Sequence, residues 1–175
     1  MSLFRRVTKP LAALFIALLA VGVMAQRVEP PRNVDVPRRL GEIRRDLRLG
    51  QLWVAQSAER LTAMRVSLEL DNRVVGSLTL EPNSGQPVPF QERNNQRLEK
   101  LPAENLVSNL LRGLRQDAQG MRFGAYVLPS PRGLEVQVYW AGKLVSYLYV
   151  DPSSGGVATD DLSMKEISSS ALRVK

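Results

Sequence analysis

The sequence has no cysteine and no histidine among its 175 residues. Without cysteine the fold has no disulfide bonds and must be held together by its core. Without histidine or cysteine there is no Ser-His-Asp triad and no Cys-His pair, and the common zinc sites and haem ligation are excluded. The composition therefore disfavours an enzyme, and we expect neither a cofactor nor a metal site.

Residues 1–25 have the pattern of a secretory signal peptide. Three basic residues precede an apolar run from Leu11 to Ala25, and small side chains at Val23 and Ala25 suit cleavage between Ala25 and Gln26. An uncleaved membrane anchor is the alternative, but a spanning helix needs about 20 apolar residues and this run is shorter. No cysteine follows the run, which excludes a lipoprotein. We therefore expect a periplasmic or secreted protein.

The charge is basic and concentrated near the start of the mature chain. The formal net charge is +7, and removal of the leader's three cations leaves +4. A patch of this kind attracts anionic lipid head groups, cell-wall polymers or an acidic protein, although a solvated helix face is the simpler interpretation. Nucleic acid is not an expected partner of an exported protein. The cluster consists of Arg38, Arg39, Arg44, Arg45 and Arg48.

The mature chain contains an internal repeat with an offset of 70 residues. Residues 65–88 align with residues 135–158 without gaps, with six identical pairs in 24 positions. An internal repeat of this kind indicates a duplicated structural unit. The identical pairs are Val66/Val136, Val75/Val145, Leu78/Leu148, Pro82/Pro152, Ser84/Ser154 and Gly85/Gly155.

Each copy begins with apolar residues at helical spacing and a following glycine, then an extended stretch and two alternating strands. The dipeptides at 71–72 and 141–142 predict tight hairpin turns. The stretch 51–58 could instead continue as helix from Trp53 to Leu61, but prolines in the second copy argue against it. The helical positions are Val36, Leu40, Ile43 and Leu47 before Gly50, and Leu106, Leu110, Leu111 and Leu114 before Gly120.

We therefore predict an α+β protein of two tandem helix-strand-strand-strand units, each a helix packed on a three-stranded antiparallel sheet. Because each unit is small, we expect the two copies to pack on each other, with fused sheets or face to face. The predicted divisions are a signal peptide (1–25), a first repeat (26–88), a linker (89–101), a second repeat (102–159) and a polar tail (160–175).

The two copies differ most on the strand face opposite the predicted core. Three tyrosines on one sheet face form an amphipathic patch of the kind enriched at interfaces, which predicts a partner-binding surface. The alternative is that this face packs on the first copy or stabilises the sheet by cross-strand pairs. Tyr139, Tyr147 and Tyr149 stand where the first copy has Glu69, Ser77 and Thr79.

The last strand and turn of the second copy, from Val150 through Asp151, Ser154 and Gly155 to Val157, resemble the PepSY domain family. Copy one has a degraded version of this turn, and the alanine-rich helix of that family is absent. The resemblance implies an exported, non-catalytic module, often in tandem, that restrains peptidases or modulates envelope proteins.

Residues 129–152, a Pro-Ser-Pro-Arg segment followed by a hairpin and a closing proline, also resemble the sheet of the curli-assembly accessory chaperone family. That family's aromatic-rich helix is absent. This resemblance implies a periplasmic factor that acts at a secretion pore.

We therefore expect an exported, non-enzymatic protein-binding or chaperone-like accessory module of the cell envelope. The alternative is a PepSY-type inhibitor or modulator of an envelope peptidase, and a hydrolase is a distant third. Glu81 and Asp151 lie in turns where a carboxylate usually accepts backbone N–H groups, and no serine lies in a nucleophile elbow. The expected partner is a secretion pore, a secreted client or a peptidase.

Overall fold

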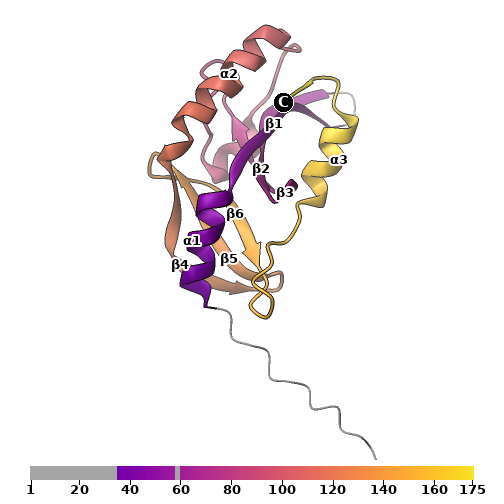
Figure 1. Cartoon of the computed structure of the whole chain (residues 1–175). Helices are drawn as coiled ribbons and strands as arrows, with labels where there is room; N and C mark the ends of the chain where they lie inside the picture. The colour runs from indigo at the N-terminus through magenta and orange to yellow at the C-terminus, as the bar shows by residue number, and fades with distance from the viewer. Residues whose placement is uncertain (1–34, 58–59) are drawn as a thin grey trace, which may run out of the picture. The chain divides into compact units, whose positions relative to one another are not determined.

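The computed structural model describes residues 35–57 and 60–175, and the predicted leader lies outside them. Each repeat forms a helix followed by three strands (Figure 1). The first repeat comprises α1 (Val36–Asp46), β1 (Arg48–Ser57), β2 (Arg60–Leu70) and β3 (Arg73–Leu80). The second comprises α2 (Glu104–Asp117), β4 (Met121–Ser130), β5 (Gly133–Trp140) and β6 (Lys143–Val150). The remaining elements are η1 (Phe90–Asn95), η2 (Ala118–Gly120), α3 (Asp161–Ser169) and β7 (Arg173–Val174).

The strands form two antiparallel sheets, which confirms the predicted α+β class. The strand orders are β3-β2-β1-β7 and β4-β5-β6, so consecutive strands of each repeat are neighbours. Strand β1 confirms the extended interpretation as far as Ser57. The alternative helix from Trp53 to Leu61 is wrong for residues 53–57 and 60–61, which lie in strands, and residues 58–59 lie outside the described residues. The prediction of three strands per sheet is incomplete, because β7 adds a fourth to the first sheet.

The two predicted hairpin turns are confirmed by their backbone conformation. Asp71 and Asn72 have φ angles of 51° and 60°, and Ala141 and Gly142 have φ angles of 47° and 79°. Two successive residues with positive φ are typical of the type I′ turn, whose twist matches that of the strands it joins. Local chemistry therefore sets the register of both hairpins.

The helices begin near the predicted positions, but the buried face of α2 differs from the prediction. The Asp35 side chain accepts a hydrogen bond of 3.2 Å from the backbone N–H of Arg38 and so caps α1. In α2 the buried residues are Val107, Leu111 and Leu114, whereas Leu106 is 46% exposed. No helix in residues 35–57 and 60–175 is long and apolar enough to cross a membrane.

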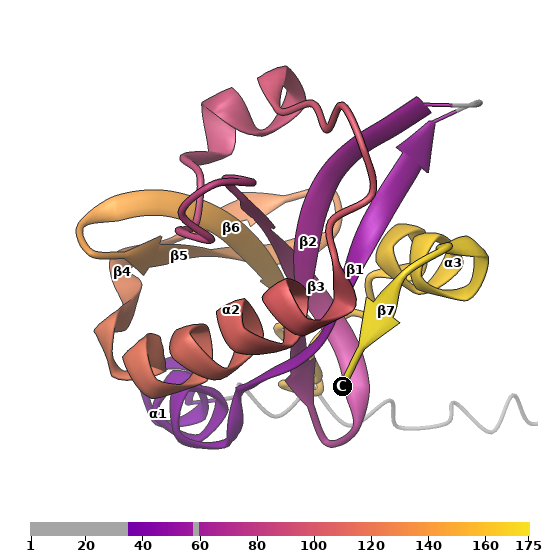
Figure 2. The same cartoon turned by 90° about the horizontal axis from the view of Figure 1, so that it is seen from above.

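Each helix contacts the other repeat, which the prediction of a helix packed on its own sheet does not include. From α1, Arg39 Nε donates a hydrogen bond of 2.8 Å to the carbonyl of Gly155 in the second repeat. From α2, Arg115 donates to the Leu49 carbonyl at 3.2 Å and to the Gly50 carbonyl at 2.9 Å, both in β1. Figures 1 and 2 show α1 beside the second repeat and α2 across the first.

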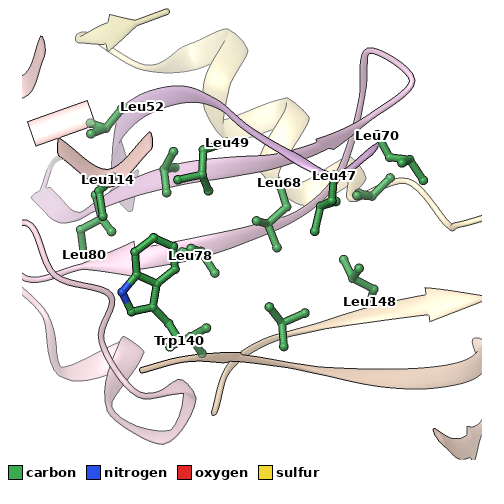
Figure 3. Packing of buried hydrophobic residues seen from close by; sticks show 14 of the residues in the cluster. Leu47, Leu49, Leu52, Leu68, Leu70, Leu78, Leu80, Leu114, Trp140 and Leu148 are labelled. Carbon is green, nitrogen blue, oxygen red and sulfur yellow. The ribbon is translucent and has the colours of Figure 1, made fainter. Parts of the chain in front are cut away.

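The two repeats share one common core. Figure 3 shows Leu68, Leu78 and Leu80 of the first repeat on the same interior as Trp140 and Leu148 of the second. A single helix on three short strands buries too little apolar surface for independent stability. A core shared by both repeats buries more apolar surface than either repeat would bury alone. We therefore expect the repeats to unfold together.

The two sheets meet at the edges of β3 and β6, which we call the seam. The Ser146 hydroxyl donates a hydrogen bond of 3.0 Å to the Ser77 carbonyl across it. Gly76 allows the close approach, since a Cβ atom there would lie 3.2 Å from Leu148 Cδ2 and 3.5 Å from the Tyr147 carbonyl oxygen. No ladder of backbone hydrogen bonds joins β3 to β6 in the described ranges. The sheets are therefore not fused into one hydrogen-bonded sheet.

Residues 160–175, predicted as a polar tail, form α3 and β7 and cover the first sheet. Asp160 caps α3 by accepting hydrogen bonds from the Ser163 backbone N–H at 3.1 Å and from its hydroxyl at 2.7 Å. Ile167 packs in a small cluster with the fully buried Trp53. The register partners of β7 are Leu52 with Val174 and Trp53 with Arg173. The burial of Ile167 against Trp53 therefore helps to fix this segment on the sheet.

Candidate partner-binding groove

The three predicted tyrosines lie on one face of the second sheet, but only two of them share a hollow. Tyr147 and Tyr149 are half-buried on β6, on either side of the fully buried Leu148. Both line a cavity of about 400 Å³ along the seam. Tyr139 lies outside the residues lining this cavity, and its hydroxyl donates a hydrogen bond of 3.1 Å to Gln137 Oε1.

The cavity, which we call the seam groove, lies between η1 and the segment that leads into α3. Its floor comes from β3 and β6, including Ser77 and Ser146. Its aromatic wall is built around Tyr147, whose ring contacts the Phe90 ring edge-on with 4.7 Å between centroids. The segment predicted as linker 89–101 therefore contributes η1 to the groove.

Two arginines lie on aromatic rings of the groove. The guanidinium carbon of Arg93 is 3.8 Å from the centroid of the Phe90 ring, and that of Arg132 is 4.8 Å from the centroid of the Tyr149 ring. Contacts of this kind are attractive and orient a guanidinium without neutralising it. No ion pair to Arg93 or Arg132 is found in residues 35–57 and 60–175. Both positive charges therefore stay available to a ligand.

A third arginine of the groove is neutralised by α3. Arg65 Nη1 donates to both carboxylate oxygens of Glu166, at 3.0 and 2.9 Å, and both side chains are only 18% exposed. Glu166 also accepts a hydrogen bond of 3.3 Å from Trp53 Nε1. The buried Arg65 Nε has no hydrogen-bond partner. This pair anchors α3 to the sheet, and Arg65 also lines the groove.

The opposite wall of the groove is acidic, but its carboxylates already accept hydrogen bonds. Asp160 caps α3 with both oxygens, and Asp161 Oδ1 accepts a hydrogen bond of 3.0 Å from the Thr159 hydroxyl. The charge of Asp160 acts on Arg93, whose pKa it raises against the larger effect of burial. The groove is therefore polarised rather than uniformly basic.

Burial shifts the pKa values of two groups in the groove. It raises the pKa of the Tyr147 phenol, and the nearby Glu135 carboxylate acts in the same direction. Burial, and then the charge of Arg65, lowers the pKa of the Arg93 guanidinium, which still stays protonated at neutral pH. Within the described part of the chain no group hydrogen-bonds the hydroxyls of Tyr147 or Tyr149. The groove therefore presents two phenol hydroxyls beside two cations.

The predicted arginine cluster is divided around α1. Arg38 and Arg39 pair with Glu42 at 3.3 and 3.0 Å, and the hydrogen bond from Arg39 is the main reason that the pKa of Glu42 is lowered. Arg45 pairs with Asp46 at 3.8 Å. Arg44 and Arg48 line a different cavity, which they share with α2. The five arginines therefore differ in their local partners.

The outer edge of the second sheet is exposed where the first sheet is covered. Strand β7 pairs with β1, whereas no strand pairs with the outer edge of β4 in the residues described. Two exposed apolar side chains lie on β4, Tyr126 (77%) and Leu128 (47%). A register shift between Phe123 and Val127, and Pro129 near the end of the strand, discourage the addition of another strand there.

The turn carboxylates have a structural role. Hydrogen bonds from the Ser153 hydroxyl and backbone N–H, and from the Ser154 hydroxyl, lower the pKa of Asp151 to about 2. In the matching turn of the first repeat, Glu81 accepts a hydrogen bond of 2.6 Å from the Ser84 hydroxyl. Within residues 35–57 and 60–175 no group of three or more acidic side chains could hold a metal ion.

No family model, curated protein or solved structure matches this chain. The functional proposal therefore depends on the groove itself. Of the residues that line it, the sequence pattern indicates Tyr147 and Tyr149, because they replace smaller residues of the first copy. It does not indicate Phe90, Arg93 and Arg132, which lie in a segment interpreted as a linker and in a turn. The one sequence feature that these three residues share is that each is an aromatic or basic residue outside the repeat pattern.

Proposed function

We propose that the protein is an exported, non-enzymatic binding module of the cell envelope, and that the seam groove receives a segment of a partner protein. The observation that supports this most is the pairing of arginine with aromatic rings in one cavity. Tyrosine and arginine are the residue types that contribute most to binding energy at protein interfaces. Here Arg93 lies on Phe90 and Arg132 lies on Tyr149.

The chemistry of the groove indicates the kind of segment that it suits. The guanidinium groups of Arg93 and Arg132 can each bind a carboxylate, since a guanidinium donates paired hydrogen bonds to its two oxygens. The phenols of Tyr147 and Tyr149 offer hydrogen bonds and flat apolar surface to the same ligand. A volume of about 400 Å³ accommodates a few side chains rather than a folded domain. An acidic peptide segment with an apolar or aromatic residue therefore fits best.

The partner can belong to any of the three classes expected from the sequence. These classes are a secretion pore, a secreted client and an envelope peptidase. The peptidase inhibitor remains the alternative, but β4 offers little support for docking of an extended segment along a sheet edge, because the bulge and Pro129 interrupt it. Binding of a segment in the seam groove does not require strand pairing.

Removal of the groove's binding groups is expected to abolish partner capture. A double variant, Arg93→Gln with Arg132→Gln, and a second one, Tyr147→Ser with Tyr149→Ser, should each lower the affinity for the partner by about tenfold or more. The measurement is affinity capture from envelope extract of the source organism, followed by mass spectrometry. Circular dichroism checks that each variant is folded, since loss of the Phe90–Tyr147 contact costs about 1 kcal/mol.

The matched control is Tyr126→Ser, which removes an exposed tyrosine from the same sheet outside the groove. The proposal predicts one protein that is retained by the control and lost from both groove variants. Equal capture by all forms, or loss caused by Tyr126→Ser alone, would show that the groove is not the binding site.

A further inference from the structure

A second cavity lies on the side of the molecule where α1 and α2 end. Its volume is about 680 Å³, within the range of small-molecule sites. It is bounded by the end of α1, the start of β1, the end of α2 and the start of β4. Both repeats therefore build it. It is lined by Arg44, Leu47, Arg48, Leu49, Arg115, Ala118, Met121 and Phe123.

The lining combines an apolar surface with cations only. Five of its residues are apolar, three are arginines and none is acidic. Leu47 and Leu49 are buried, and Met121 and Phe123 are partly buried against the common core. A ligand that covers these side chains would bury apolar surface that now faces the cavity. The cavity therefore favours a ligand with a hydrocarbon part and a negative charge.

The arginines hold their positions through backbone carbonyls rather than carboxylates. Arg48 Nη1 donates to the Leu47 carbonyl at 2.9 Å, and Arg115 donates to the carbonyls of Leu49 and Gly50. Arg44 has no hydrogen bond or ion pair with the part of the chain that the structure describes. A carbonyl orients a guanidinium but does not neutralise its charge. An anion that enters this cavity therefore meets three positive charges with no carboxylate partner.

The positive charge extends into a neighbouring hollow of about 370 Å³ that shares Arg115. This hollow is also lined by Arg112, and no aspartate or glutamate side chain belongs to its lining. Clustered charges of one sign in a concave surface attract a counter-ion more strongly than a single exposed residue. The positive charge around the cavity therefore attracts anionic ligands, independently of the apolar contacts inside it.

We propose that this cavity binds a single-chain anionic amphiphile. Its carboxylate or phosphate head lies at Arg44, Arg48 and Arg115, and its hydrocarbon chain covers the apolar side chains of the cavity. An uncharged chain leaves the charges of the three arginines without a counter-ion, and a simple anion leaves the apolar surface exposed. None of these arginines lines the seam groove, so this site is independent of the proposed partner-binding site.

The test is titration of the purified protein by calorimetry with four compounds, the two anionic chains below their micelle concentrations and the alcohol below its solubility limit. These are dodecanoate, dodecyl phosphate, dodecanol and inorganic phosphate. At least one of the two anionic chains should bind about tenfold or more tightly than both dodecanol and phosphate, and the stronger of the two identifies the head group. Dodecanol that binds as tightly as the anionic chains, phosphate that does, or no binding of either anionic chain would overturn the proposal.

Variants on α1 separate this site from general surface charge. Arg44→Gln should weaken the stronger anionic ligand by about fivefold, because it removes one of three charges. Arg45→Gln removes the same charge from the next position, which does not line the cavity, and should leave the affinity unchanged. Both side chains are exposed, so neither variant should affect folding. An equal effect of the two variants would also overturn the proposal.

A fluorescence measurement places the hydrocarbon chain. Trp140 is the register partner of Met121, which lines the cavity, whereas Trp53 lies in a separate cluster beneath α3. Dodecanoate brominated near its end should quench tryptophan emission, and Trp140→Phe should remove most of that quenching. Quenching that persists in this variant would place the chain elsewhere and contradict the assignment.

Discussion

Leu148→Ala should lower the free energy of unfolding by about 3 kcal/mol, which is typical of a fully buried leucine. Leu148 is fully buried on β6, and its Cδ2 atom lies 3.2 Å from the place that a Cβ atom on Gly76 would occupy. Truncation therefore opens a cavity at the seam between the two repeats. Urea unfolding, followed by tryptophan emission and by circular dichroism, measures the effect.

The same experiment tests whether the repeats share one core. Both probes should report a single transition for the natural protein and for Leu148→Ala, at different midpoints. The control Leu106→Ala removes a leucine that is 46% exposed on α2 and should cost less than about 1 kcal/mol. Two separate transitions, one for each repeat, would contradict a common core.

Glu166→Ala should destabilise the protein by about 2–3 kcal/mol, because it leaves most of the Arg65 guanidinium buried without its carboxylate. The Arg65–Glu166 distance is 2.9 Å and both side chains are 18% exposed, so solvent screening is limited. The substitution also removes the acceptor of Trp53 Nε1. The free energy of unfolding in urea and the emission maximum of Trp53 are the two measurements.

Two comparisons identify the cause of this effect. Glu166→Gln keeps an acceptor for Trp53 and Arg65 and should cost about half as much, since an amide still satisfies hydrogen bonds. Lys165→Ala removes an exposed charge from the same helix and should change stability by less than about 0.5 kcal/mol. If Glu166→Ala were as mild as Lys165→Ala, α3 would not be anchored by this pair.

The elements of each repeat could be predicted because their signals are local. The turns at Asp71–Asn72 and Ala141–Gly142 depend on residues that tolerate positive φ, and the alternation along β5 depends on one buried face. The duplication strengthened these predictions, because each copy supplies an independent example of the same pattern. The prediction places helix α2 correctly but assigns Leu106 instead of Val107 to its buried face. Both residues are apolar, and only packing decides which of them is buried.

The pairing of helices with sheets could not be predicted from the repeat. Both copies present the same kind of helix and the same kind of sheet, so either pairing satisfies the apolar pattern. What distinguishes them is tertiary contact, such as Leu110 against Gly85, where an added Cβ atom would lie 2.6 Å from Leu110 Cδ2. The C-terminal elements were missed for a similar reason. Ile167 is one apolar residue among serines, and its importance depends on Trp53, more than a hundred residues away.

The seam groove combines a predicted part with an unpredicted one. Tyr147 and Tyr149 could be recognised because the first copy has Ser77 and Thr79 at the same positions. Phe90 reaches Tyr147 only because the chain crosses from the first repeat to the sheet of the second. Helices and connecting segments that cross between the repeats therefore create both cavities, which the repeat pattern alone does not contain.

The most direct test of the groove as the partner-binding site is site-specific photo-cross-linking in living cells of the source organism. Tyr149→p-benzoylphenylalanine places the reactive group in the groove and keeps an aromatic ring there, and Tyr126→p-benzoylphenylalanine places it on the same sheet outside the groove. We predict one cross-linked protein from position 149, absent from position 126 and lost when Arg93→Gln and Arg132→Gln are added. The same adduct from both positions, or no adduct from position 149, would contradict the assignment of the groove.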